Sequence, residues 1–233
     1  MTVPELSVVI PARDEEGNVA ALLDELGAAL AGLEFEAIVV DDGSRDGTRA
    51  RLDEAAARFS WLRVLAHQRP RGISAAMKTA IDASSAPWVS TLDADLQNDP
   101  RDLPRLLELA RREGCDLVQG RRARRRDGPL RRFESAVGRA ARRVLLGDPT
   151  ADTGCSTRVM TARLARALPL ESRGMHRFIP AYASLSGMRV VETPVEHRPR
   201  RSGASKILPF VRGVAGLVGC FQVRRLARRR PRP

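Results

Sequence analysis

The stretch TLDADLQNDP, residues 91–100, places Asp93, Asp95 and Asp99 at the end of an apolar run that reads as a buried strand. Open α/β sheets bind their ligands at the carboxyl ends of the strands, and carboxylate and amide oxygens suit a hard divalent cation. Turns from a strand into a helix also favour Asp. In that alternative Asp93 begins a helix cap and Asp95 is merely solvated, so the flanking sequence has to distinguish the two interpretations.

Short runs rich in β-branched residues lie on both sides of this stretch and alternate with helical patterns. This alternation predicts an α/β fold with a mostly parallel sheet and helices on both faces. The predicted strands are LSVVI (6–10), AIVVDD (37–42), LRVLA (62–66), WVSTLDAD (88–95), DLVQG (116–120) and MRVVETPV (188–195), and the predicted helices cover 16–31, 47–58, 73–84 and 101–113. Because parallel strands end at one edge of a sheet, the acids that follow these strands should converge.

Basic residues concentrate in two segments of the 233-residue chain, whose formal net charge is +12. Residues 119–143 contribute +8 and residues 198–233 contribute +11, which leaves −7 for the remainder. An acidic body with two basic segments predicts anionic partners that bind at defined places. With 43% hydrophobic residues, the chain can bury the core of one domain.

The remaining composition excludes several classes. Three cysteines and three scattered histidines do not form a disulfide framework or a zinc site. The N-terminus lacks the features of a signal peptide, so we expect a cytoplasmic protein. The longest apolar stretch, ILPFVRGVAGLVGCF (207–221), is interrupted by Arg212 and is too short to span a bilayer, but it could lie on one. We therefore predict one folded domain over 1–204, followed by an amphipathic interfacial helix (about 205–226) with a basic tail over 205–233.

The sequence contains neither a GxGxxG after a strand nor a GxxxxGK[ST] phosphate loop. It has a D-x-D instead. Alternate side chains of an extended segment share a face, so Asp93 and Asp95 should point the same way. Such a pair can hold Mg²⁺ or Mn²⁺ while substrate phosphates complete the coordination, and Gln97 can add an amide oxygen or orient the ligands. In VVDDGSRDGT (39–48), Asp42 can accept a hydrogen bond from a base or ribose.

Seven stretches resemble, in order, the motifs of family 2 glycosyltransferases of the polyprenyl-phosphate branch, which includes dolichol-phosphate mannose synthase-like and undecaprenyl-phosphate sugar transferase-like enzymes. They are VVIPARDEEGN (8–18), AIVVDDGSRDGT (37–48), RGISAAMKTAI (71–81), WVSTLDADLQNDP (88–100), DLVQGRR (116–122), DTGCSTRVM (152–160) and VVETPVEHRPRRSGASKI (190–207). The resemblance covers roughly residues 5 to 210 and implies a GT-A-like fold.

The resemblance also implies roles for individual residues. The nucleotide pocket would be lined by Pro11, Arg13, Glu15, Val40 and Asp42, and the metal and diphosphate would be held by Asp93, Ala94, Asp95 and Gln97. Arg122 would face the phosphates, Arg132 and Ser135 would face the acceptor phosphate, and Arg200 and Lys206 would close over the diphosphate. The chain departs from the family pattern at Arg13, where many relatives have an aromatic residue, and at Arg121, which replaces the Ser of a G-S-R motif. It also lacks the transmembrane hairpins that many relatives carry.

The implied reaction is a metal-dependent, inverting transfer of a sugar from a nucleoside diphosphate sugar to a polyprenyl (dolichyl or undecaprenyl) phosphate. A hydroxyl acceptor would need a carboxylate as general base. A lipid phosphate, with a second pKa of ~6, is already ionised near neutrality, and it needs cations that hold it beside an anionic donor. The expected partners are both substrates and the membrane surface, without nucleic acid, and the expected location is peripheral, on the cytoplasmic face of the cell membrane.

Two other functions remain open on the sequence. A family 2 transferase with a hydroxyl acceptor would leave the arginine-rich segment without a role. A non-catalytic basic protein that binds nucleic acid or anionic lipid would have no use for the D-x-D, and an aromatic content of 4% offers few platforms for stacking bases.

Overall fold

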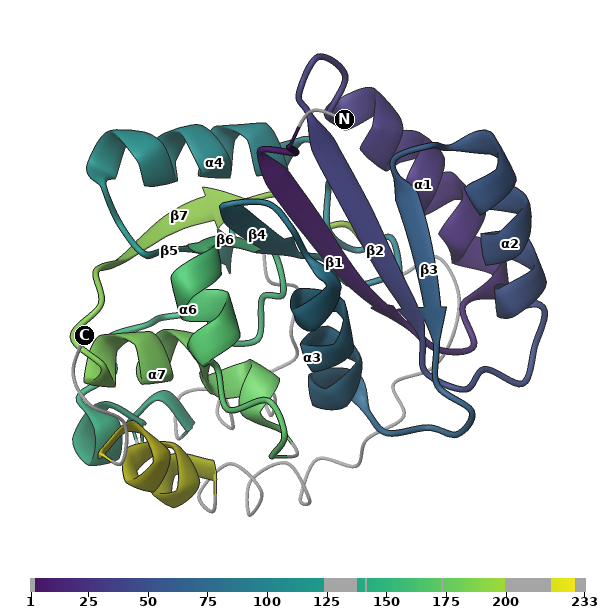
Figure 1. The fold of residues 1–233 in the computed structure, drawn as a ribbon. Helices are drawn as coiled ribbons and strands as arrows, with labels where there is room; N and C mark the ends of the chain where they lie inside the picture. Colours follow the sequence, from purple (N-terminus) through teal and green to yellow (C-terminus); the bar gives the residue numbers. More distant parts are fainter. Residues whose placement is uncertain (1–2, 124–137, 141, 173, 200–218, 229–233) are drawn as a thin grey trace.

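The computed structural model describes residues 3–123, 138–140, 142–172, 174–199 and 219–228, and it shows a seven-stranded sheet between helices (Figure 1). The strands are β1 (Leu6–Ala12), β2 (Phe35–Asp41), β3 (Leu62–Ala66), β4 (Trp88–Thr91), β5 (Leu117–Arg122), β6 (Arg158–Thr161) and β7 (Val190–Val195). Their order in the sheet is β3-β2-β1-β4-β6-β5-β7. Of these seven strands only β6 runs antiparallel to its neighbours, β4 and β5, so the predicted mostly parallel sheet is confirmed.

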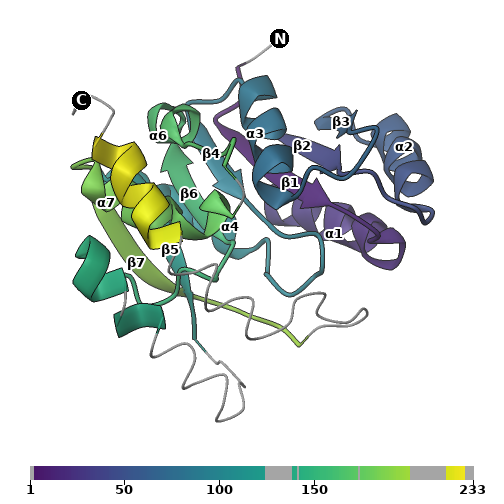
Figure 2. The same cartoon turned by 90° about the horizontal axis from the view of Figure 1, so that it is seen from below.

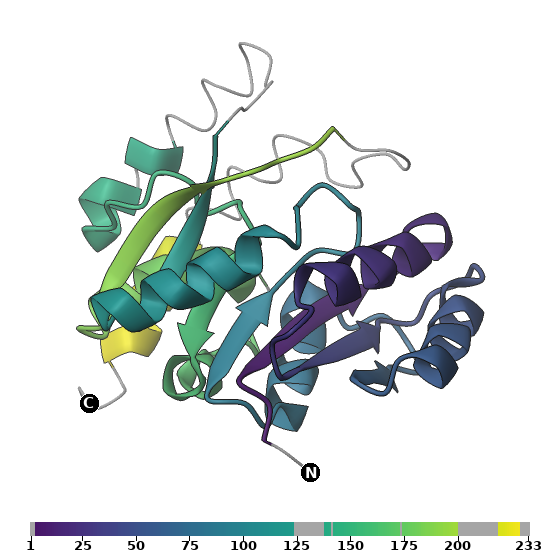
Figure 3. The same ribbon diagram turned by 90° about the horizontal axis from the view of Figure 1, so that it is seen from above.

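Helices cover both faces of the sheet, as the sequence predicts (Figures 2 and 3). One face carries α1 (Glu16–Ala29), α2 (Thr48–Arg58) and α4 (Asp102–Glu113); the other carries α3 (Ile73–Ala83), α6 (Ala162–Ala167), a 3₁₀ turn (Met175–Phe178) and α7 (Ile179–Leu185). Residues 138–140, 142–146 and 219–228 are also helical.

The alternation of side chains along β1 shows how one strand serves both layers. Leu6, Val8 and Ile10 belong to the core beneath α1 and α4, whereas Val9 belongs to the core beneath α3. Successive side chains of a strand point to opposite faces, so a central parallel strand is apolar without interruption. This explains why the predicted strand positions agree with the structure.

One prediction about local structure is wrong, and two elements were not predicted. The fourth strand ends at Thr91 rather than at residue 95, and Leu96 has a left-handed backbone conformation (φ 60°), so the D-x-D lies in a turn and not on an extended segment. The sequence also gave no expectation of β6 or of α6. β6 has only four residues, which is too short for a clear alternating pattern.

The predicted C-terminal helix is described only in part. Residues 205–218 lie outside the described residues, and 219–228 are helical. Cys220 and Val223 are buried in the core beside α7, and a side chain at Gly219 would overlap the ring of Phe178. This helix therefore packs against the domain on one side. Within the described part of the chain, no helix is both long and apolar enough to cross a membrane.

A buried carboxylate on β2 predicts an acid-dependent contribution to stability. Glu36 accepts hydrogen bonds from the Ser7 hydroxyl (2.7 Å) and from the backbone N–H and hydroxyl of Ser85 (2.7 and 2.8 Å), and it lies 3.3 Å from the Arg63 guanidinium. Burial raises the pKa of Glu36, but these hydrogen bonds outweigh burial and leave the pKa below its usual value.

We therefore expect Glu36→Gln to lower the free energy of unfolding at neutral pH. A lowered pKa in the folded state stabilises the fold above the unfolded pKa of ~4.3, and this contribution is lost as the pH falls through the folded-state pKa. Urea unfolding of both proteins across pH should show the difference shrinking towards acid. A difference that stays constant below pH ~4, or that matches exposed Glu54→Gln, would contradict the assignment.

Candidate functional site

One edge of the sheet gathers the polar residues that follow the strands. The carboxyl ends of β1, β2, β4 and β5 meet there because these strands run in the same direction. β6 runs in the opposite direction, so the turn that precedes it (residues 152–157) reaches the same edge. The Thr91 hydroxyl donates to the Ser156 carbonyl oxygen, and the Asn98 amide donates to the Ser156 hydroxyl (2.8 Å). The site therefore combines the end of β4 with the turn before β6.

Asp93 and Asp95 lie in the turn that follows β4. The Asp95 carboxylate accepts a hydrogen bond from the Gln97 backbone N–H (3.2 Å), which holds the turn closed. Part of Asp93 is accessible, but its carboxyl group is surrounded by protein: burial raises the pKa of Asp93, and the nearby Asp95 charge raises it further. The two carboxylates thus influence each other, although they lie in a turn and not on a strand.

This acid pair fits a divalent cation whose remaining ligands come from a substrate. Among the residues that the structure describes, no group of three or more His, Cys, Asp or Glu side chains could enclose a metal ion. Mg²⁺ is commonly held by one or two carboxylates together with substrate phosphates, so a pair is sufficient. A cation would also relieve the repulsion that raises the pKa of Asp93. Ala94 is buried between the two acids, and the Gln97 side chain donates to the Arg198 carbonyl oxygen (3.4 Å).

Arg122, which was predicted to face the phosphates, lies at the end of β5. Its guanidinium forms two hydrogen bonds with the Asp152 carboxylate (2.7 and 2.8 Å). Glu192 on β7 fixes the backbone around Asp152, because the Glu192 carboxylate accepts hydrogen bonds from the N–H groups of Ala151 and Asp152. The Arg122 charge lies close enough to favour the ionised form of Asp93. The structure thus brings Arg122 together with the acid pair.

Sequence reasoning missed Arg158, the first residue of β6. Its side chain is buried and donates to the carbonyl oxygens of Cys155 (2.5 Å) and His176 (3.1 Å), while its Nε has no hydrogen-bond partner. Its charge, like that of Arg122, favours ionised Asp93. A single Arg within the apolar run of residues 157–160 was the available signal, because an arginine is rarely buried without an electrostatic role.

His176 packs on the first turn of α3 and completes this side of the site. Its Nδ1 lies 2.9 Å from the Ser74 hydroxyl. Burial, together with the charges of Arg177 and Arg158, lowers the pKa of His176 to about 3, so its ring is neutral near pH 7. Cys155 is buried in the core, and burial raises the pKa of its thiol, which is the environment of a structural cysteine rather than of a nucleophile.

Asp42 is placed at the end of β2, but its carboxylate is occupied by protein groups. It accepts from the backbone N–H groups of Arg71 (2.8 Å) and Gly72 (2.7 Å), and it lies 2.7 Å from His67 Nδ1. Asp42 thereby fixes the loop between β3 and α3. Val40, predicted to line the nucleotide pocket, is fully buried in the core under α3, so its side chain is not accessible to a ligand.

The predicted residues of β1 and its following turn lie at the same edge. Pro11 is half-buried on β1, and the Arg13 side chain is 44% exposed, which leaves it accessible to a ligand. Glu15 is tied to the neighbouring turn because its backbone N–H donates to the Thr48 hydroxyl (2.8 Å). Four predicted residues lie outside the described residues: Arg132, Ser135, Arg200 and Lys206.

Comparison with known proteins identifies a family and several relatives of this chain. The family described as "Glycosyl transferase family 2" matches residues 7–168. The chain is 37% identical to dodecaprenyl-phosphate galacturonate synthase of Rhizobium johnstonii, over 87% of this chain and 61% of that protein. It is 36% identical to undecaprenyl-phosphate 4-deoxy-4-formamido-L-arabinose transferase of Pseudomonas fluorescens, over 88% and 61%. The chain thus spans about three fifths of the length of these relatives.

Solved structures show the same fold at lower identity. Glucosyl-3-phosphoglycerate synthase from Mycobacterium tuberculosis, in complex with Mn²⁺, UDP and glucosyl-3-phosphoglycerate, superposes with a TM-score of 0.74 at 22% identity, over 93% of this chain and 80% of that one. A second structure of the same synthase contains Mg²⁺ and UDP and gives a TM-score of 0.71 at 23% identity. These similarities agree with the GT-A-like α/β fold predicted from the sequence.

Proposed function

Because this chain belongs to glycosyl transferase family 2, we propose that it transfers a sugar from a nucleoside diphosphate sugar to a polyprenyl phosphate. The proposal rests on the acid pair Asp93 and Asp95 at the carboxyl ends of the strands, with Arg122 and Arg158 beside it. The acids suit a cation that accompanies the donor diphosphate, and the arginines suit two anionic substrates. The names of the curated relatives, which are polyprenyl-phosphate enzymes, support this choice of acceptor.

The site residues divide between the two substrates. Pro11, Arg13 and Glu15 surround the nucleotide, supported by Asp42 and Val40, while Asp93, Ala94, Asp95 and Gln97 hold Mg²⁺ or Mn²⁺ and the diphosphate. The cation neutralises charge on the leaving diphosphate. Arg122, Arg200 and Lys206 stabilise the same charge, and Arg132 and Ser135 hold the acceptor phosphate. The metal in the structures of the Mycobacterium tuberculosis synthase supports this assignment.

The acceptor phosphate attacks the anomeric carbon from the face opposite the diphosphate, so the configuration is inverted. A phosphate monoester with a second pKa of ~6 is largely ionised at neutral pH, and no side chain has to remove a proton from it. Burial lowers the pKa of His176 to about 3, which makes its ring a weak base and is consistent with a site that works by charge and position rather than by a general base. The reaction takes place at the cytoplasmic face of the cell membrane, to which the protein binds peripherally.

A screen of nucleoside diphosphate sugars with undecaprenyl phosphate tests the proposal. Formation of a lipid-linked sugar, followed by chromatography, should require Mg²⁺ or Mn²⁺ and should stop when EDTA is added. The anomeric configuration of the product should be opposite to that of the donor. Transfer to a hydroxyl acceptor, with none to the lipid phosphate, would refute the acceptor assignment.

Substitution of Arg132 tests the acceptor site separately. Arg132→Ala should raise the KM for polyprenyl phosphate far more than the KM for the nucleotide sugar, because a charge-assisted hydrogen bond contributes roughly 1.5–3 kcal/mol, or about 10- to 150-fold. Steady-state kinetics with each substrate varied in turn measures both constants. Equal changes in the two KM values would remove Arg132 from the acceptor site.

A further inference from the structure

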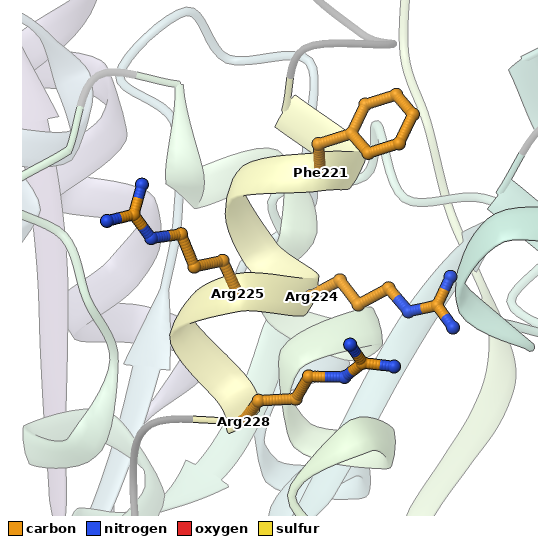
Figure 4. A pocket seen from close by; sticks show the side chains of 4 residues that line it. All are labelled: Phe221, Arg224, Arg225 and Arg228. Atoms are coloured by element: carbon orange, nitrogen blue, oxygen red, sulfur yellow. The ribbon is translucent and has the colours of Figure 1, made fainter.

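The helical residues 219–228 have one buried side and one exposed side. Cys220 and Val223 are buried against the domain, whereas Phe221 is 64% exposed. Phe221 lines a shallow hollow together with Arg224, Arg225 and Arg228, and Figure 4 shows that Phe221, Arg224 and Arg228 extend to one side of the helix. The helix is therefore anchored to the protein through its inner side while an aromatic ring and three guanidinium groups face outwards.

A second helical segment from a distant part of the sequence lies beside it. The Arg224 guanidinium donates to the Leu145 carbonyl oxygen (3.4 Å), and Figures 1 and 2 both place residues 142–146 next to residues 219–228. In residues 142–146 Arg143 is exposed and Val144 is 83% exposed, and in the preceding helical residues 138–140 Arg139 is exposed. We call the exposed side chains of both segments the two-helix surface: Arg139, Arg143, Val144, Phe221, Arg224, Arg225 and Arg228.

The charge of this surface is not compensated within the described part of the chain. No acid occurs among the helical residues 138–140, 142–146 and 219–228, and no described carboxylate forms an ion pair with the five arginines of the surface. The adjacent Asp148 has a fully buried side chain, 3.4 Å from Arg142. In contrast, three exposed arginines of α2 each pair with a carboxylate: Arg49 with Asp53, Arg51 with Glu54, and Arg58 with Asp24.

We propose that the two-helix surface binds the headgroup layer of an anionic lipid bilayer. The arginines complement anionic headgroups, and Phe221 and Val144 supply apolar groups that can enter the boundary between headgroups and acyl chains. A nucleic acid would satisfy the arginines but would leave the exposed valine without an apolar environment. The inference rests on the proposed function, because it identifies the surface by which an enzyme without a described membrane span approaches a lipid substrate.

The position of the surface along the chain connects it to the acceptor. Residues 124–137, which include Arg132 and Ser135, directly precede one helical segment, and residues 200–218, which include Arg200 and Lys206, directly precede the other. In the sequence, the residues assigned to the acceptor phosphate and the diphosphate therefore adjoin the two helical segments of the surface. The sequence led us to expect the C-terminal helix alone at the membrane; the structure adds residues 138–140 and 142–146 to the same surface.

Sedimentation with vesicles tests the inference in the full chain. The vesicles contain phosphatidylcholine with or without phosphatidylglycerol and no polyprenyl phosphate. The wild type should bind only the anionic vesicles. Replacing Arg224, Arg225 and Arg228 together by Gln should weaken that binding by ~100-fold, since each basic residue near an anionic surface contributes about fivefold. Phe221→Ser should weaken binding at unchanged net charge. The matched control replaces Arg49, Arg51 and Arg58 of α2 together by Gln, which removes the same charge from paired, exposed positions and should leave binding close to wild type.

A separate activity assay distinguishes failure of the membrane-binding inference from failure of the proposed function. Transfer to a short-chain, water-soluble polyprenyl phosphate needs no bilayer, so the Arg224/Arg225/Arg228 variant should retain this activity while it loses vesicle binding. Equal weakening by the α2 control would mean that total charge alone drives binding, and would overturn the assignment of the surface. Three other results would also overturn the assignment. They are vesicle binding at the wild-type level by both the arginine and the Phe221 variants, self-association of the protein through this surface, and binding to duplex DNA but not to vesicles.

Discussion

Asp95→Asn should lower the turnover number by ~100-fold or more while the fold remains intact. Asp95 lies in the turn after β4, where its charge acts on Asp93 and its carboxylate accepts from the Gln97 N–H (3.2 Å). An amide retains an oxygen for that backbone hydrogen bond, but it removes a charge from the proposed cation site, and changes even in groups that only orient metal ligands typically cost 10- to 100-fold. Initial rates at saturating Mn²⁺ and donor measure the effect, and circular dichroism verifies the fold.

The matched control for this substitution is Asp82→Asn. Asp82 is an exposed carboxylate at the far end of α3, where it pairs with Lys78 (2.5 Å). This control should retain wild-type activity, since surface pairs contribute little to stability and Asp82 is distant from the strand edge. Activity of Asp95→Asn within a few-fold of the control would exclude Asp95 from the metal and diphosphate site.

Asp42→Ala should lower the free energy of unfolding by about 3 kcal/mol. The substitution removes the acceptor for the N–H groups of Arg71 and Gly72 and the partner of His67 Nδ1, all at a site where Asp42 is only 4% exposed. Each buried donor left without an acceptor costs about 1–3 kcal/mol, and partial access of water to the loop reduces the sum. Urea unfolding at neutral pH measures this difference.

This second substitution distinguishes a supporting role for Asp42 from direct contact with the nucleotide. The hydrogen bonds of Asp42 predict a large loss of stability. They also predict that the affinity for the nucleotide sugar falls in proportion to the disordering of the loop after β3. Exposed Asp53→Ala on α2 serves as the control and should change stability by less than ~0.5 kcal/mol. If Asp42→Ala unfolds like the wild type but no longer binds the donor, Asp42 acts as a ligand of the nucleotide.

The sequence predicted those parts of the site that depend on strand direction. Asp93, Asp95 and Arg122 follow buried parallel strands, and strand direction alone brings them to one edge. It could not predict the partners of Asp42, because Arg71 and Gly72 lie in a loop whose path depends on tertiary contacts. Arg158 was missed for a related reason: its importance depends on the antiparallel insertion of β6 between β4 and β5, and four residues carry too weak a pattern to predict that insertion.

The prediction for the C-terminal helix was incomplete in a different way. The sequence predicted a helix at the membrane interface, whereas residues 219–228 pack on the domain through Val223 and leave Phe221 exposed on the opposite side. Helical periodicity identifies an apolar side but not the surface that it contacts. The neighbouring residues 142–146 could be recognised as part of the same surface only once the chain was folded.

The pairing of β7 with β5 has a consequence for synthesis of the chain. Residues 117–122 of β5 pair with residues 190–195 of β7, which are made much later, so β5 has an unpaired edge until nearly the whole domain has left the ribosome. An uncovered strand edge is a template for association with other chains. A fragment that ends at residue 168, where the family match ends, would keep this edge permanently open, and it should aggregate even though it contains the acid pair, Arg122 and Arg158.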